Sequence, residues 1–240
     1  MITKCQRAAA AALLALAATA AHAVPMAPHD YRYVALPGTT AGSGAGHRAG
    51  TVLEDETVRF SYLHWEDSQH TGMPAGGSIQ SQVVRTEDGT LDFYWRITTD
   101  ADSAGSADIF RLNNFYDAKY SYDIDFIADG PGSVAPRHAL MMGEESSAWA
   151  RRKIGDIDFY FNPSDLSQGR SSYYFFIDTD ATSYAKTATA SLNPELIFMA
   201  GSGDYGVFAP VPEPSSMALL AGGVGLLAWT ARRRAARRGA

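Results

Sequence analysis

Cysteine is almost missing from this chain of 240 residues, because the single one is Cys5, close to the N-terminus. A disulfide framework is thereby excluded, and the fold must be held by packing alone. Helical periodicity is also nearly absent, and residues 140–153 come closest to it. The sequence therefore argues against both a disulfide-stapled scaffold and a helical protein.

Basic residues are scarce in the middle of the chain. Residues 24–211 contain 13 Lys and Arg against 25 Asp and Glu, a net charge of about −12, whereas the whole chain carries −6. Such a surface repels a phosphate backbone, so we expect no nucleic-acid partner. Cations, basic surfaces and neutral glycans remain open as partners.

Signatures of nucleophilic catalysis are lacking as well. There is no G-x-S-x-G nucleophile elbow, and the only cysteine lies in the N-terminal segment. We therefore predict no catalytic residues and no enzymatic activity. The alternative is a secreted glycan-active hydrolase, which would need an Asp/Glu pair about 5 to 9.5 Å apart in a cleft.

The last thirty residues contain three signals in a fixed order. The first is Val211, Pro212, Glu213 and Pro214, in which the prolines favour an extended, accessible backbone. The second is the uncharged run 215–231, which as a helix would cover roughly 25 Å of the ~30 Å hydrocarbon core. The third is a basic cluster that would be retained on the cytoplasmic side: Arg232, Arg233, Arg234, Arg237 and Arg238.

This arrangement resembles the C-terminal PEP-CTERM sorting signal of Gram-negative bacteria that make exopolysaccharide. The resemblance covers residues 210–240. It implies processing near the motif by an exosortase, a membrane transpeptidase of the cysteine type, which releases or re-anchors the exported domain. The implied partners are the exosortase, the inner membrane transiently, and exopolysaccharide. The alternative is an ordinary single-pass anchor with a chance Pro-Glu-Pro in its linker.

The N-terminus is typical of a secretory signal peptide. Lys4 and Arg7 precede an apolar run over residues 8–21, and cleavage is predicted after Ala23. We expect an exported protein, anchored in the inner membrane as a precursor and then located at the cell surface or in the extracellular matrix. The predicted organisation is a signal peptide (1–23), a leader strand with a Gly-rich loop (24–50), a β-sandwich (51–209) and a sorting signal (210–240).

From Thr51 the apolar residues recur every second position, which indicates strands. In residues 91–98 the row Leu91, Phe93, Trp95 and Ile97 alternates with polar residues. Short segments of this kind, separated by turn signals, predict an all-β fold: an antiparallel β-sandwich of the jelly-roll or immunoglobulin-like kind, with one solvated face per sheet. Predicted strands are 31–36, 57–64, 79–86, 91–98, 119–127, 156–161, 171–179, 196–200 and 205–208, with turns at 72–77 and 87–89.

Three Asp-x-Asp pairs are candidate calcium ligands, because residues i and i+2 share a face of a strand. They are Asp123 with Asp125, Asp156 with Asp158, and Asp178 with Asp180. Calcium takes six to eight oxygens, so a pair would have to recruit a loop or another pair. The alternative is a polar outer face that keeps the sheets soluble. No other cofactor is predicted.

Aromatic residues outside the inward rows suggest a platform for sugar rings. Tyr94 and Tyr174 alternate with core positions, and Trp65 falls in a predicted loop, within a segment that runs from His64 at the end of a strand to His70 in a turn. The alternatives are rings that cover a seam between sheet and loop, and histidines that are simply solvated rather than metal ligands. We therefore expect a non-enzymatic, exosortase-sorted surface or matrix protein, associated with exopolysaccharide, that binds glycan or calcium weakly.

Overall fold

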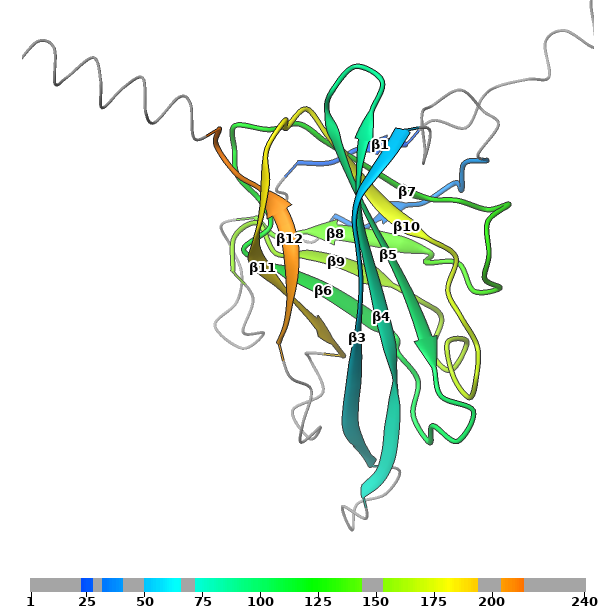
Figure 1. Ribbon diagram of the computed structural model, residues 1–240. Helices are drawn as coiled ribbons and strands as arrows, with labels where there is room; N and C mark the ends of the chain where they lie inside the picture. The colour runs from blue at the N-terminus through cyan, green and yellow to red at the C-terminus, as the bar shows by residue number, and fades with distance from the viewer. Residues whose placement is uncertain are drawn as a thin grey trace, which may run out of the picture.

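The protein is described by a computed structural model that places residues 23–27, 32–40, 50–65, 72–143, 153–193 and 204–213. Over these residues the fold contains strands and no helix, which confirms the all-β prediction (Figure 1). The strands are β1 (Val24–Pro25), β2 (Val34–Ala35), β3 (Gly50–Trp65), β4 (Gly72–Thr86), β5 (Leu91–Thr99), β6 (Ile109–Asn113), β7 (Tyr122–Phe126), β8 (His138–Met141), β9 (Ile157–Tyr160), β10 (Phe175–Thr179), β11 (Tyr184–Leu192) and β12 (Tyr205–Pro210).

The strands form two antiparallel sheets of six strands each. The first has the order β1-β7-β10-β5-β4-β3, and the second has the order β12-β11-β6-β9-β8-β2. Both sheets contribute to one continuous hydrophobic core, as the alternating apolar rows predicted. The edge strands are β1 and β3 in the first sheet and β12 and β2 in the second.

Aromatic side chains join the two sheets at the centre of the core. Phe175 of β10 lies 4.8 Å from the ring of Phe159 in β9 and 5.1 Å from that of Phe110 in β6. Trp95 of β5 is 5.9 Å from Phe110, and all four residues are buried. Tilted and edge-on ring pairs of this kind add to the stabilisation from buried area. The core can therefore hold the domain together without disulfides.

The longest element is the hairpin of β3 and β4, which pair from Gly50 with Thr86 to Trp65 with Gly72. Residues 72–77 were predicted to be a turn because of their glycines and proline, and this prediction is wrong. A Cβ on Gly77 would lie 2.2 Å from the carbonyl oxygen of Thr98 and 2.6 Å from the Phe60 ring. Glycine is needed here for close packing within the sheet rather than for a turn.

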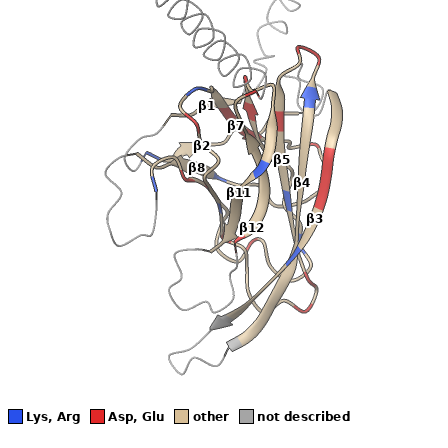
Figure 2. Ribbon diagram, turned by 60° about the vertical axis from the view of Figure 1, so that its left-hand side comes forward, with Lys and Arg blue, Asp and Glu red and all other residues tan. Residues whose placement is uncertain are grey.

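An acidic segment on β3 connects the first sheet to the second. Figure 2 shows β3 with a red band, which comprises Glu54, Asp55 and Glu56. Lys186 of β11 lies 2.6 Å from Glu56, and the Tyr184 hydroxyl donates to Glu54 at 2.9 Å. These contacts tie the edge strand β3 to the neighbouring end of the other sheet.

Four strands were not predicted from the sequence, namely β1, β6, β8 and β11. The segment 140–153 was the best candidate for a helix, but it begins in β8, which pairs with β9. Residues 144–152 lie outside the described residues. Residues 1–22 of the predicted signal peptide lie outside them too, as do the predicted strand 196–200, the span 215–231 and the arginines Arg232, Arg233 and Arg234. Within the described part of the chain, no helix is long and apolar enough to cross a membrane.

Candidate functional site

The predicted sorting motif begins where the sandwich ends. Val207, Ala209 and Pro210 of β12 are buried, and Pro210 pairs with Tyr184 of β11. The Val211 amide donates to the Ser183 carbonyl at 3.0 Å, which extends the pairing by one residue beyond the strand. The motif is thus joined to the folded domain without an intervening linker.

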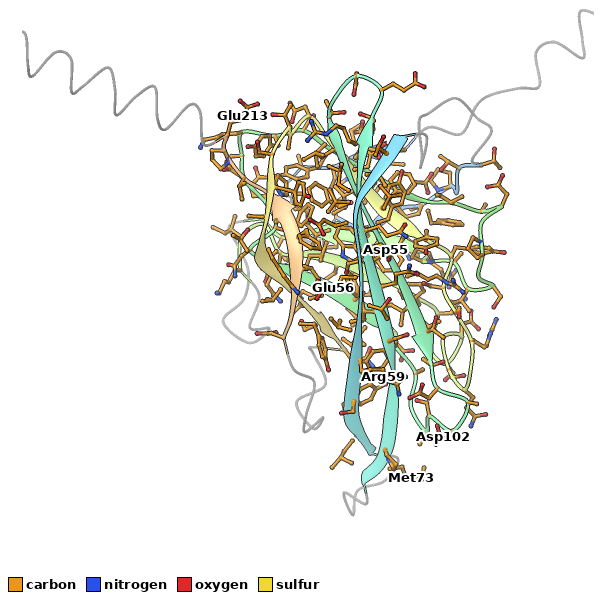
Figure 3. All side chains as sticks on the ribbon, viewed as in Figure 1. Asp55, Glu56, Arg59, Met73, Asp102 and Glu213 are labelled. Atoms are coloured by element: carbon orange, nitrogen blue, oxygen red, sulfur yellow. The ribbon has the colours of Figure 1, made fainter. Side chains whose placement is uncertain are left out.

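The motif's only acidic side chain contacts the sandwich directly. The Thr182 hydroxyl, in the loop between β10 and β11, donates a hydrogen bond to the Glu213 carboxylate. Pro212 and Glu213 are exposed, as predicted for an accessible motif, and Figure 3 shows Glu213 at the end of the domain. Burial and then the charges of Asp117, Asp180 and Glu213 raise the pKa of Tyr120, so this end of the domain is acidic. Pro214 lies outside the described residues.

Sequence reasoning did not identify Thr182 as part of the site. The residue sits one position before a segment that pairs with the end of β12, and only the register of β11 and β12 brings it next to Glu213. No local pattern in the sequence signals this contact.

A row of three aspartates crosses the first sheet, and we call it the aspartate ladder. Asp178 of β10 is the direct partner of Asp92 in β5 and of Asp123 in β7. Directly opposed side chains on one face have Cβ atoms about 4.5 to 5.5 Å apart. The three carboxylates are therefore neighbours on the face that points away from the core.

Burial and mutual repulsion alter the ionisation of the aspartate ladder. Asp92 is only 3% exposed, and this burial, followed by the charge of Asp178, raises its pKa to about 8. The Tyr94 hydroxyl donates to Asp92 at 3.3 Å and partly opposes this rise. Burial and the charge of Asp178 also raise the pKa of Asp123. Like charges placed this close disfavour full ionisation.

The structure pairs aspartates across strands rather than along them. Asp178 faces Asp92 and Asp123, whereas Asp180 is exposed and accepts the Ser121 amide at 2.9 Å. Asp125 is fully buried and accepts the Gly38 amide at 2.8 Å. Among the described residues, no group of three His, Cys, Asp or Glu side chains has a geometry that could hold a metal ion. Calcium therefore stays a prediction.

The carboxylates of Asp156 and Asp158 are bound by other groups of the domain. Asp158 forms a two-pronged ion pair with Arg111 of β6, with Nε to Oδ1 at 2.7 Å and Nη2 to Oδ2 at 2.9 Å. The Tyr160 hydroxyl donates to the same carboxylate at 3.0 Å. Both charged side chains are at most 2% exposed. Asp156 accepts the Lys153 amide at 2.7 Å, and its pKa is raised chiefly by burial.

The predicted aromatic platform is wrong for its two tyrosines. Tyr94 is fully buried and Tyr174 is 4% exposed, in a second apolar cluster with Val84, Ile127 and Phe176. The Tyr174 hydroxyl donates to Gln80 Oε1 at 2.7 Å. The two rings point to the face opposite the main core, as the alternation of the strands predicts. The prediction failed because this part of the outer face is buried rather than solvated. The side chains of Trp65 and of the histidines beside it lie outside the described residues.

The fold and this end of the domain define a class: an all-β sandwich whose last strand leads directly into a C-terminal sorting signal. Residues 210–234 match the family model described as the PEP-CTERM protein-sorting motif. The chain therefore carries a PEP-CTERM sorting motif, which confirms the resemblance drawn from Pro212, Glu213 and Pro214 and implies processing by an exosortase. Comparison with curated proteins gave no match, and comparison with solved structures gave none either.

Proposed function

We propose that this chain is a non-enzymatic protein of the cell surface or extracellular matrix that associates with exopolysaccharide after its processing by an exosortase. The observation that carries the proposal is the direct connection between β12 and the sorting motif. The sorting signal serves to deliver the β-sandwich, so the function of the protein resides in this folded domain after delivery. Its net charge of about −12 over residues 24–211 favours neutral glycans and cations over anionic partners.

The packing of the domain supports a binding role over the hydrolase alternative. Its aromatic core is filled from both sheets. Two hollows within the described part of the chain, one beside Arg32 and one beside Arg59, hold about 210 and 200 Å³. Asp92 and Asp178 lie on a sheet face and share a hydrogen bond, and the burial of Asp92 leaves no room for a sugar ring between them. This pair does not have the spacing that a glycosidase needs.

Weak calcium binding at the aspartate ladder is part of the proposal, with loop or backbone oxygens completing the site, because the carboxylates of the ladder do not by themselves have the geometry to hold a metal ion. Burial and then the charge of Asp178 raise the pKa values of Asp92 and Asp123, and a cation bound beside these carboxylates would offset the repulsion between them. Added calcium should raise the melting temperature of the wild type but not that of Asp123→Asn. Equal melting curves for the wild type with calcium and with chelator would end the calcium proposal.

Alanine replacement of the sorting motif tests the processing step. In the native host, the variant with alanines at Pro212, Glu213 and Pro214 should be exported and then accumulate as an uncleaved, membrane-held form. Intact-mass analysis shows whether the tail arginines have been removed. Glu87→Ala, at an exposed hairpin, is the control for loss of one acidic residue. Normal processing of the triple variant would refute the role of the motif.

Cosedimentation tests the matrix association. The processed protein should pellet with exopolysaccharide isolated from its host and stay in solution with an unrelated neutral polymer. Retention in the supernatant in both cases would refute the association while leaving the sorting role intact.

A further inference from the structure

The folded sandwich approaches the sorting motif very closely. Pro210 is buried in β12, and Glu213 follows three residues later. An extended chain spans at most about 3.6 Å per residue, so these two positions are within roughly 11 Å of each other. A membrane enzyme that cuts near the motif must take an extended segment of chain into its own cleft. The end of β12 and the loop 180–183 stand in the way of that approach.

Two hydrogen bonds hold the motif against this loop. The Val211 amide donates to the Ser183 carbonyl at 3.0 Å. The Thr182 hydroxyl donates to Glu213, which carries the only charge of the Pro-Glu-Pro segment. A hydrogen bond to an ionised carboxylate is stronger than one between neutral groups. An enzyme that recognises Glu213 or pairs with the backbone of Val211 has to compete with these contacts.

We propose that Thr182 and Ser183 form a clasp with Val211 and Glu213, and that the sorting enzyme acts on the motif only after this clasp opens. The proposal rests on the proposed processing by an exosortase. The clasp can open by breaking these two hydrogen bonds without unfolding the sandwich. Thr182 is exposed, and β12 is an edge strand with β11 as its one neighbour in the sheet. The clasp thus sets the rate at which precursor becomes processed protein and leaves the sandwich folded.

Thr182→Val tests the clasp, because valine keeps the shape of threonine and removes the donor. Thr182→Ser is the matched control, since it keeps the hydroxyl. The full-length chain is expressed in its native host, and a pulse-chase measures the conversion of precursor to processed form. Conversion should be roughly three- to tenfold faster in Thr182→Val, the factor for losing one exposed charge-assisted hydrogen bond. Thr182→Ser should match the wild type.

Conversion of Thr182→Val at the wild-type rate would overturn the clasp, and slower conversion would show instead that the contact assists the enzyme. Equal melting temperatures of the two variants verify that the sandwich is unaffected. Hydrogen exchange of the Val211 amide, measured on the detergent-solubilised precursor, gives a second readout: it should be faster with valine and unchanged with serine. Unchanged exchange with valine would also overturn the proposal. Failure of the proposed function is distinguishable, because the alanine-replaced motif would then be processed like the wild type.

Discussion

Replacement of Asp92 by asparagine should change how the stability of the domain depends on pH. Asp92 is the second residue of β5 and is 3% exposed, with Asp178 directly opposite and the Tyr94 hydroxyl donating to it. Asparagine has nearly the same shape and retains an oxygen that can accept from Tyr94. Its amide can also donate to Asp178, which removes the repulsion between the two carboxylates.

The sign of the effect follows from the raised pKa. Asp92 titrates at about 8 in the folded protein and at about 4 in an unfolded chain. Below about pH 4 the Asp92 carboxyl is protonated in both the folded and the unfolded state, so its raised pKa does not lower the stability. As the pH rises toward 8, the unfolded state releases the proton while the folded state retains it, and the stability of the wild type falls. The loss amounts to at most about 1.4 kcal/mol per pH unit.

Between pH 5 and pH 8 this slope gives the wild type a loss on the order of 3–4 kcal/mol relative to Asp92→Asn. Urea unfolding of the processed protein at pH 5, 6.5 and 8 measures the difference. Glu87→Gln is the control, because it removes one carboxylate at the exposed tip of the hairpin between β4 and β5. If the free energy of unfolding of Asp92→Asn runs parallel to that of the wild type across this range, the buried-carboxylate argument fails.

Three further substitutions test the packing. Arg111→Met removes the cation that pairs with the buried Asp158 carboxylate and should lower the free energy of unfolding in urea by about 3–5 kcal/mol. Adding Asp158→Leu to the same chain should restore most of this stability. Phe175→Ala should cost about 3–5 kcal/mol, because it opens a cavity between the sheets; a much smaller loss would contradict its central place in the core. Gly77→Ala places a Cβ 2.2 Å from a backbone oxygen and should lower the melting temperature far more than Gly130→Ala, whose Cβ would meet its nearest atom, in the Ile127 side chain, only at 3.4 Å. Equal effects of the two glycine substitutions would refute the close-packing argument.

The fold class could be predicted from the sequence because the strongest strands alternate clearly. Residues 91–98 place Phe93, Trp95 and Ile97 in the core as expected, and β5 follows those bounds to within one residue. The strand β11 was missed because its inward positions include Ala188 and Ala190, whose small side chains give a weak periodic signal. Alanine is depleted in strands and supplies little apolar contrast, so tertiary packing decides its conformation here.

Of the candidate site, only the residues that are contiguous in the sequence could be predicted. The sorting motif is a contiguous pattern, so Pro212, Glu213 and Pro214 are visible in the sequence. The aspartate ladder depends on the register of β5, β7 and β10, because a shift of one residue would turn Asp92 or Asp178 to the other face. The sequence showed that these aspartates lie on outward rows, but it could not show which of them are neighbours.

The strand β12 links the two properties on which this chain depends, namely core packing and sorting. Its residues Val207 and Ala209 are buried in the core, and its C-terminal end passes directly into Val211 and Glu213. A long flexible linker would let an enzyme reach the motif whether or not the domain had folded. Here the motif takes its position from a folded strand, so the folding of the sandwich and the presentation of the motif are coupled. The coupling acts through the pairing of β12 with β11, because β11 is the one strand beside β12 in its sheet.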